Sequence, residues 1–305
     1  MRTISVVIPV YNNEESLYEL NEQVCSVLMD LKTHAVEIVY VDDGSQDRSF
    51  DRLLLIKREN SLPTTIVKLA GNFGQKNAVL AGFSRANNEL VATISADLQD
   101  PPGIIREMYK ALGDGKIVIA ERSSRGDSLG AKVASRITYF FMRLVNRDIP
   151  RRGFDCWMVD AKILNYLVSR NRGLAMSQAN FFANGFKVNR ITYKRNSRPF
   201  GKSGWMFRSK IQAFLEVFSL GMSSLARHMI IVGAILSIFA LLMFSLILVS
   251  FFKGDSPFQG FTFLASSLTL FCSFLMITSG STLTLLSQVL ESQGSAETFV
   301  IDAVI

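Results

Sequence analysis

Short apolar runs alternate with amphipathic segments along the first 120 residues of the chain. The apolar runs predict buried strands at 4–10, 36–41, 65–69, 91–94 and 116–120. The segments between them repeat apolar residues at helical spacing and predict helices at 14–31, 46–60, 75–85 and 104–112. Strands that alternate with helices of this length predict a mostly parallel sheet covered on both faces, which is an α/β fold.

Polar side chains gather directly after four of these strands. They are Tyr11-Asn12, Asp42-Asp43, Asn72 to Gln75, and Asp97 with Gln99. Because open sheets of this kind bind ligands beyond the carboxyl ends of their strands, the four clusters predict one shared site. The chain has no GxGxxG and no GxxxxGK[ST] stretch, so neither a dinucleotide site nor a P-loop is expected.

The stretch from Ser95 to Pro102 follows the strand expected at 91–94 and ends in two prolines that block further extension. A carboxylate at Asp97 and an amide at Gln99 can both point at one cation. A magnesium or manganese ion on a diphosphate needs few protein oxygens, because water and phosphate complete its shell. The alternative is a solvated turn with an acidic edge.

The middle of the chain is more irregular. Residues 121–127 are basic and polar, a helix is expected at 130–145, and Gly153-Phe154-Asp155 are expected in a loop. An edge strand is expected at 188–193, followed by a flexible basic loop at 195–204. Residues 205–225 are amphipathic, which predicts either a helix along a membrane surface or a buried domain helix.

Two long apolar stretches follow, at 229–252 and at 256–290 with its apolar centre at 261–286. Each is long enough to cross a bilayer as a helix, and the link between them carries only Lys253 and Asp255. They predict a transmembrane hairpin rather than core helices. Small residues at Ser279-Gly280-Ser281 would allow close helix contact in an oligomer.

The net charge of +7 is concentrated before the first apolar stretch. This placement favours a membrane partner over nucleic acid, and it predicts that the N-terminal domain faces the cytoplasm. No signal peptide is expected, because Arg2 leads directly into a strand. The three cysteines lack metal-site spacing and indicate a reduced compartment, and both histidines are expected to be structural.

With these motifs the chain resembles the family-2 glycosyltransferases of GT-A fold. Within them it is similar to the polyprenyl-phosphate glycosyltransferases, such as dolichol-phosphate mannose synthases and bactoprenol (undecaprenyl-phosphate) glucosyltransferases. The resemblance rests on Ile8 to Asn12, Val41 to Ser45, Asn72 to Gln75, Ala96 to Pro102, Gly153 to Asp155 and the paired apolar stretches.

The resemblance implies roles for the matching residues. A nucleotide-sugar donor would be held by Pro9, Tyr11, Asn12, Asp42, Asp43, Asn72 and Gln75. Mg2+ or Mn2+ would be held by Asp97 and Gln99. The acceptor phosphate would meet Arg122, Arg136, Arg198, Lys202 and Ser203, and the catalytic set would be Asp97, Asp155, Arg122, Arg136 and Arg198. The alternatives are a loop-capping role for Asp155 and surface ion pairs for the arginines.

Three positions depart from the pattern of the family. Asn13 stands where Glu is common, Ser95 where the first Asp of an Asp-x-Asp is common, and Gly204 where Lys is common. The loss of two carboxylates should weaken metal binding, because hard cations prefer charged oxygens. Lys202 could compensate for the lysine absent at 204.

The sequence as a whole predicts inverting transfer of a sugar from a nucleotide-sugar, with UDP preferred, to polyprenyl (undecaprenyl) phosphate, for modification of cell-envelope glycans. The expected parts are a cytoplasmic GT-A domain (1–202), an amphipathic juxtamembrane segment (203–226), two transmembrane helices (227–290) and a cytoplasmic tail (291–305). The expected location is the inner membrane, as a homo-oligomer. Two alternatives are a catalytically impaired scaffold of a glycan-assembly complex and a processive polysaccharide synthase; the synthase is disfavoured because the chain has no Gln-x-x-Arg-Trp stretch.

Overall fold

The computed structural model describes residues 2–31, 33–113, 117–123, 154–170, 180–183, 185–196, 207–253, 260–293 and 299–305. The chain forms two compact units. One comprises residues 1–214 and 294–305, and the other comprises residues 215–293. The predicted Arg136, Arg198, Lys202, Ser203 and Gly204 lie outside the described residues, as does the helix expected at 130–145.

The first unit is built on a sheet of eight strands in the order β7-β5-β6-β4-β1-β2-β3-β8. The strands are β1 (Ile4–Val10), β2 (Val36–Asp42), β3 (Thr64–Leu69), β4 (Leu90–Thr93), β5 (Ile117–Arg122), β6 (Phe154–Asp160), β7 (Val188–Tyr193) and β8 (Ile301–Val304). Pairings β1–β2, β1–β4, β2–β3 and β5–β7 are parallel. Pairings β4–β6, β5–β6 and β3–β8 are antiparallel. Because the parallel pairings are in the majority, the predicted mostly parallel α/β sheet is confirmed.

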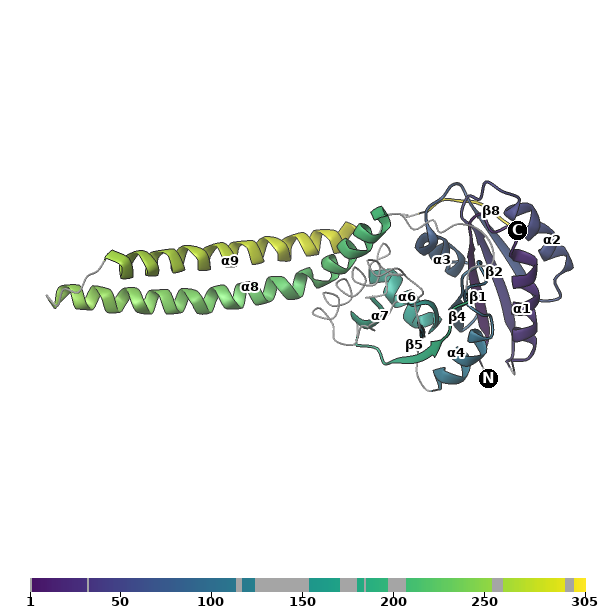
Figure 1. Cartoon of the computed structure of the whole chain (residues 1–305), viewed down its shortest axis with the longest axis horizontal. Helices are drawn as coiled ribbons and strands as arrows, with labels where there is room; N and C mark the ends of the chain where they lie inside the picture. Colours follow the sequence, from purple (N-terminus) through teal and green to yellow (C-terminus); the bar gives the residue numbers. More distant parts are fainter. Residues whose placement is uncertain are drawn as a thin grey trace. The chain divides into compact units, whose positions relative to one another are not determined.

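Helices cover both faces of this sheet (Figure 1). The helices of the first unit are α1 (Leu17–Met29), α2 (Ser49–Glu59), α3 (Gln75–Phe83), α4 (Ile104–Leu112), α6 (Ala161–Arg170) and α7 (Asn180–Ala183). Along β1, Val6 and Ile8 belong to the core that packs under α1, α2 and α4, whereas Val7 faces α3, where a Cβ on Gly82 would lie 2.4 Å from Val7 Cγ1. The side chains of one strand therefore alternate between two helical layers.

The structure corrects one local prediction. Phe154 and Asp155 were expected in a loop, but they open strand β6, which lies between β4 and β5 and runs antiparallel to both. Phe154, Cys156 and Met158 are buried, as befits a central strand. The polar Asp155 and the neighbouring glycine hid this apolar pattern, because Asp and Gly are depleted in strands.

The C-terminal residues of the chain belong to the first unit. After the two long helices, β8 returns to the sheet and pairs with β3. The sequence predicts only a tail here, because four strand residues without a strong pattern give little signal. The predicted domain boundaries otherwise stay a prediction.

The second unit is a helical hairpin formed by most of α8 (Phe207–Phe252) and α9 (Gly260–Gln293), which run side by side (Figure 1). Both contain a segment long and apolar enough to cross a membrane, Leu225–Ser250 and Thr262–Ser287, and most of each segment is exposed. The amphipathic segment expected at 203–226 lies partly in α8, whose helix begins at Phe207.

Small residues line the contact between α8 and α9. A Cβ on Gly233 would lie 3.0 Å from the Ser273 carbonyl oxygen, and a Cβ on Gly280 would lie 2.9 Å from that of Ala226. The Ser237 and Ser273 hydroxyl oxygens are 2.8 Å apart. Gly280, which the sequence suggested for contacts between chains, is therefore used within the hairpin.

Candidate functional site

The loops that follow β1, β2 and β3 are tied together by hydrogen bonds. The backbone N–H of Asn12 donates to Ser45 Oγ at 3.1 Å, and the backbone N–H of Gln46 donates to Asn12 Oδ1 at 2.8 Å. Gly44 has φ +70°, and a Cβ there would lie 2.6 Å from the backbone carbon of Gly71. Only glycine fits this approach, because any side chain would collide with the neighbouring backbone.

Asp43 shapes the third of these loops. Its Oδ1 accepts a hydrogen bond from the Phe73 amide at 2.7 Å, and its Oδ2 accepts one from the Gly74 amide at 2.9 Å. Burial raises the pKa of Asp43 to about 6, although these two hydrogen bonds favour the charged form. The carboxylate therefore holds the backbone at the start of α3.

Asp42 lies beside it and is also buried. Burial raises the pKa of Asp42, while hydrogen bonds from Ser45 and the positive charge of Lys68 oppose part of that rise. The side chains of Tyr11, Asn72 and Gln75 are exposed at the same edge of the sheet, and Pro9 is buried in β1. The predicted nucleotide residues therefore lie on the three joined loops or on the strand and helix residues that adjoin them.

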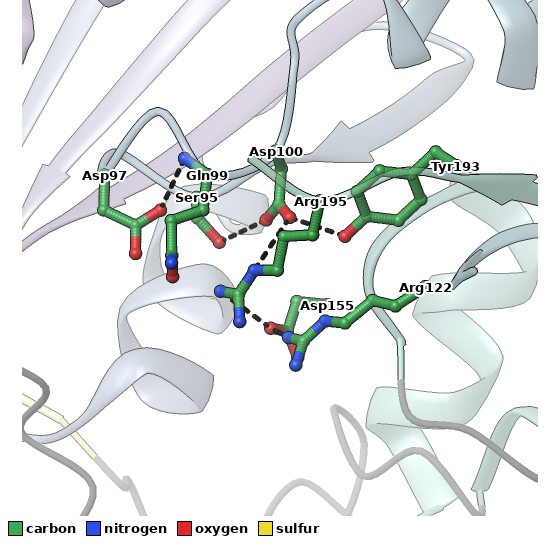
Figure 2. Close-up of polar contacts among 8 residues, drawn as sticks. All are labelled: Ser95, Asp97, Gln99, Asp100, Arg122, Asp155, Tyr193 and Arg195. Carbon is green, nitrogen blue, oxygen red and sulfur yellow. Dashed lines mark hydrogen bonds and ion pairs between the residues drawn. The ribbon is translucent and has the colours of Figure 1, made fainter. Parts of the chain in front are cut away.

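The segment after β4 presents two oxygen-bearing side chains. Leu98 is buried and has a positive φ of 57°, so the backbone turns sharply between Asp97 and Gln99. The backbone N–H of Gln99 donates to Asp97 Oδ1 at 3.2 Å. The side chains of both residues are half-buried. Figure 2 shows the two side chains on the same side of the turn. The Ala96 carbonyl, which accepts from Ser16 Oγ at 2.7 Å, fixes the turn to the start of α1.

Asp100 is fully buried and is held by other side chains. Its carboxyl accepts hydrogen bonds from Ser95 Oγ at 2.8 Å and from the Tyr193 hydroxyl at 2.5 Å, and Arg195 Nε lies 3.5 Å from Oδ1 (Figure 2). Burial raises the pKa of Tyr193, so its hydroxyl keeps the proton that it donates. Asp100 therefore anchors the turn through these contacts, whereas the side chains of Asp97 and Gln99 stay partly exposed.

Asp155 at the start of β6 forms an ion pair with Arg122 at the end of β5 (Figure 2). Arg195 Nη2 lies 3.9 Å from the same carboxylate, so Arg195 bridges Asp100 and Asp155. The backbone N–H of Asn196 donates to the backbone carbonyl oxygen of Gln99 at 2.9 Å. The first residues of the predicted basic loop are thus fastened to the turn that carries Asp97.

The structure brings Asp97, Gln99, Arg122 and Asp155 to one end of the sheet, and the roles assigned to them stay predictions. Sequence reasoning missed Tyr193 and Arg195. Tyr193 ends an edge strand and gave no signal, whereas Arg195 could have been included because it opens the basic loop at 195–204.

The sequence and the fold of the chain match those of known proteins. The model of Glycosyl transferase family 2 matches residues 5–168, from β1 into α6. The chain is a family-2 glycosyltransferase. This confirms both the predicted family and the predicted class of enzyme.

Curated relatives match the glycosyltransferase over most of its length. A protein of Photorhabdus laumondii named undecaprenyl-phosphate 4-deoxy-4-formamido-L-arabinose transferase is 30% identical over 253 residues, covering 82% of this chain and 77% of the relative. A protein of the same name from Yersinia enterocolitica is 31% identical and covers 78% of this chain and 73% of the relative.

Solved structures share the fold of the glycosyltransferase. Glucosyl-3-phosphoglycerate synthase from Mycobacterium tuberculosis, solved with Mn2+, UDP-glucose and phosphoglyceric acid, superposes with a TM-score of 0.53. The match covers 72% of this chain and 80% of that one at 14% identity, which supports the GT-A fold.

The oxygens after β4 fit a hard divalent cation. Among the described residues, no three His, Cys, Asp or Glu side chains gather into a cluster that could hold a metal alone. Asp97 and Gln99 instead offer one carboxylate and one amide oxygen, which suits an ion whose other ligands are water and phosphate. A cation bound to Asp97 and Gln99 would need oxygens of a bound diphosphate to complete its coordination shell.

Proposed function

We propose that this glycosyltransferase transfers a sugar from a nucleotide-sugar, with UDP preferred as the carrier, to undecaprenyl phosphate. The product would be a lipid-linked monosaccharide used to modify cell-envelope glycans. The single observation that carries the proposal is that a family-2 glycosyltransferase domain and two membrane-length apolar helices occur in one chain. The names of the curated relatives support the acceptor.

The donor would lie across the joined loops after β1, β2 and β3. Tyr11 is 41% exposed, so its ring is available to stack on a base. Asp43 acts on the donor through the Phe73 and Gly74 backbone that it holds. Asp97 and Gln99 would hold Mg2+ or Mn2+, and the metal would offset negative charge on the leaving diphosphate.

The reaction is a single displacement. An oxygen of the acceptor phosphate attacks the anomeric carbon of the sugar, and the bond from that carbon to the nucleoside diphosphate breaks. The diphosphate leaves with the electron pair, and the configuration at the anomeric carbon inverts. The acceptor is already anionic, so the chain needs to position it rather than deprotonate it.

Arg122 and Asp155 are placed to act at the sugar and the acceptor. Arg122 is 12% exposed and paired with Asp155, which is 28% exposed, so both sit at the wall of the site. A guanidinium can hold two phosphate oxygens at once, and its pairing with Asp155 orients it before the acceptor arrives. Asp155 could then orient a sugar hydroxyl. Arg136, Arg198, Lys202 and Ser203 are proposed to complete the phosphate site.

The hairpin would hold the enzyme in the inner membrane with the catalytic unit in the cytoplasm. The apolar segments of α8 and α9 expose large side chains such as Ile235, Ile238, Leu264 and Phe271, which water would not favour. A lipid acceptor requires a catalytic unit held at the membrane surface. A homo-oligomer is also proposed, because exposed small residues such as Ser281 would let helices of two chains approach closely.

The test is an assay with the full chain in nanodiscs, undecaprenyl phosphate, Mn2+ and a panel of UDP- and GDP-sugars. We expect one donor to give a lipid-linked monosaccharide. Asp97→Asn should lower turnover at least about a hundredfold, because one preorganised interaction that stabilises charge in the transition state is worth about 3 kcal/mol. The matched control is Asp30→Asn, an exposed carboxylate at the far end of α1.

Two results would contradict the proposal. Turnover that survives Asp97→Asn would remove the metal assignment. Absence of both product and Mn2+-dependent UDP binding in the native chain would instead favour the scaffold alternative, because an impaired scaffold needs no donor.

A further inference from the structure

Strand β8, formed by Ile301–Val304, lies next to the last residues of β3, which lead into the loop that carries Asn72. It pairs antiparallel with β3, and the Ala70 amide donates to the Val300 carbonyl at 2.9 Å. Figure 1 shows this yellow strand on the edge of the sheet. Gly71, the next residue, begins the loop whose Phe73 and Gly74 amides are bound by Asp43. One hydrogen-bonded path therefore runs from the end of the chain to the donor site.

The segment is anchored at both of its ends. Phe299, before the strand, is buried, and Ile305 exchanges two backbone hydrogen bonds of 2.9 Å with Ile66. Without this segment β3 would be the edge of the sheet. An unpaired edge strand frays more readily than a central one, and the loop that follows it would fray with it.

Lys68 makes a second connection. Its Nζ lies 3.6 Å from Asp302 Oδ2 in β8 and 4.6 Å from the centre of the Phe50 ring in α2. Lys68 is also the register partner of Asp42 on the neighbouring strand β2, so its positive charge lies beside that carboxylate. The charge of Asp302 thus helps to keep Lys68 extended between the terminal strand and the loop after β2.

We propose that β8 is a positioning element for the donor site: by pairing with β3 it orders residues 71–74 and sets Lys68 beside Asp42. The segment that follows the second apolar helix is then part of the nucleotide pocket. Only the binding part of this inference rests on the proposed function. The ordering of the loop is a property of the chain alone.

A pair of proline substitutions separates strand pairing from other effects. Ile66 and Ile305 form a hydrogen-bonded pair, so alternation along an antiparallel ladder makes Lys68 and Ala303 the next such pair. Val67 and Val304 form the non-bonded pair between them. Ala303→Pro therefore removes a donor that faces β3, whereas Val304→Pro removes one that faces outward and serves as the matched control.

Hydrogen exchange of the full chain without ligand is the first measurement. We expect Ala303→Pro to speed exchange of the Phe73 and Gly74 amides about tenfold relative to Val304→Pro, as expected for loss of one to two hydrogen bonds. Protection in β1 and β2 should be unchanged, which shows that the sheet is still folded. A second variant that lacks residues 299–305 should give the same result.

UDP binding with Mn2+ is the second measurement. We expect Ala303→Pro to raise the Kd of UDP about fivefold relative to Val304→Pro, the equivalent of one lost hydrogen bond. The inference is overturned if β8 loses protection in Ala303→Pro while exchange at Phe73 and Gly74 stays within twofold of the control. Failure of the proposed function would appear differently. The native chain would then not bind UDP, but Ala303→Pro would still speed hydrogen exchange at the Phe73 and Gly74 amides.

Discussion

Asp100 and Tyr193 are 93 positions apart and are joined by a hydrogen bond of 2.5 Å inside the protein. The bond links the turn after β4 to the last residue of the edge strand β7. The Asn196 amide adds a second link to the same turn through the Gln99 carbonyl. The turn that carries Asp97 and the basic loop therefore have a common support, and the contacts of Asp100 leave its carboxyl unavailable to a cation.

Tyr193→Phe tests this support. The change removes the hydroxyl donor to Oδ1 of a buried carboxyl and leaves that oxygen with only Arg195 Nε at 3.5 Å, which costs about 1–3 kcal/mol. We expect the free energy of unfolding to fall by that amount and Mn2+-dependent UDP binding to weaken. Chemical denaturation and calorimetry measure the two effects. Tyr18→Phe, on the exposed part of α1, is the control and should change neither; equal effects in both variants would contradict the assignment.

Ser95→Asp would install the carboxylate that the family often has at this position. Ser95 Oγ donates to Asp100 Oδ2 at 2.8 Å, so an aspartate would place two carboxyl groups together in a buried site. We expect lower stability than in Ser95→Ala, which only loses the hydrogen bond, and no gain in Mn2+ affinity. Mn2+ titration followed by electron paramagnetic resonance checks this. Tighter Mn2+ binding in Ser95→Asp would show that the site lacks only a carboxylate.

Asp43 predicts a dependence of stability on pH. Its pKa is raised by burial from 3.8 to about 6 in the folded protein, so the folded state binds more protons than the unfolded state between these values. Stability therefore falls as pH rises from about 4 to about 6, by at most about 3 kcal/mol, and is constant above that range. Asp43→Asn should lack this slope. Denaturation curves at several pH values measure it, and parallel curves for both proteins would refute the assignment.

Gly44→Ala tests the close approach of the loops after β2 and β3, which we propose to hold the donor. The Cβ would meet the Gly71 backbone at 2.6 Å, and φ of +70° disfavours any side chain. We expect a loss of about 1–3 kcal/mol in stability and weaker UDP binding. Gly113→Ala is a matched control, because Gly113 also has a positive φ but a Cβ added there would meet no heavy atom within 4 Å. Similar UDP affinity in the two variants would mean that the approach is dispensable.

Much of the fold follows from local pattern, because each strand that precedes a cluster is short, apolar and followed by polar residues. The same pattern predicts Asp97 and Gln99 as a cluster after a strand, and the structure places both in the turn after β4, while their role stays a prediction. Strand β6 was missed at Phe154 and Asp155, because its antiparallel insertion between β4 and β5 depends on partners far away in the sequence. Tyr193 and β8 were missed for the same reason: what they contact is decided by tertiary pairing, and neither carries a motif.

The small residues between α8 and α9 fix how the two helices can move. Ala226 and Gly233 are seven residues apart, and so are Ser273 and Gly280 on the facing helix. Ile277 packs against Gly233 and Ile230 packs against Gly280, so a slide by one helical turn, about 5.4 Å, would move both isoleucines away from the glycines that leave room for them. The two helices therefore resist sliding along each other, and we expect them to move together as one rigid pair.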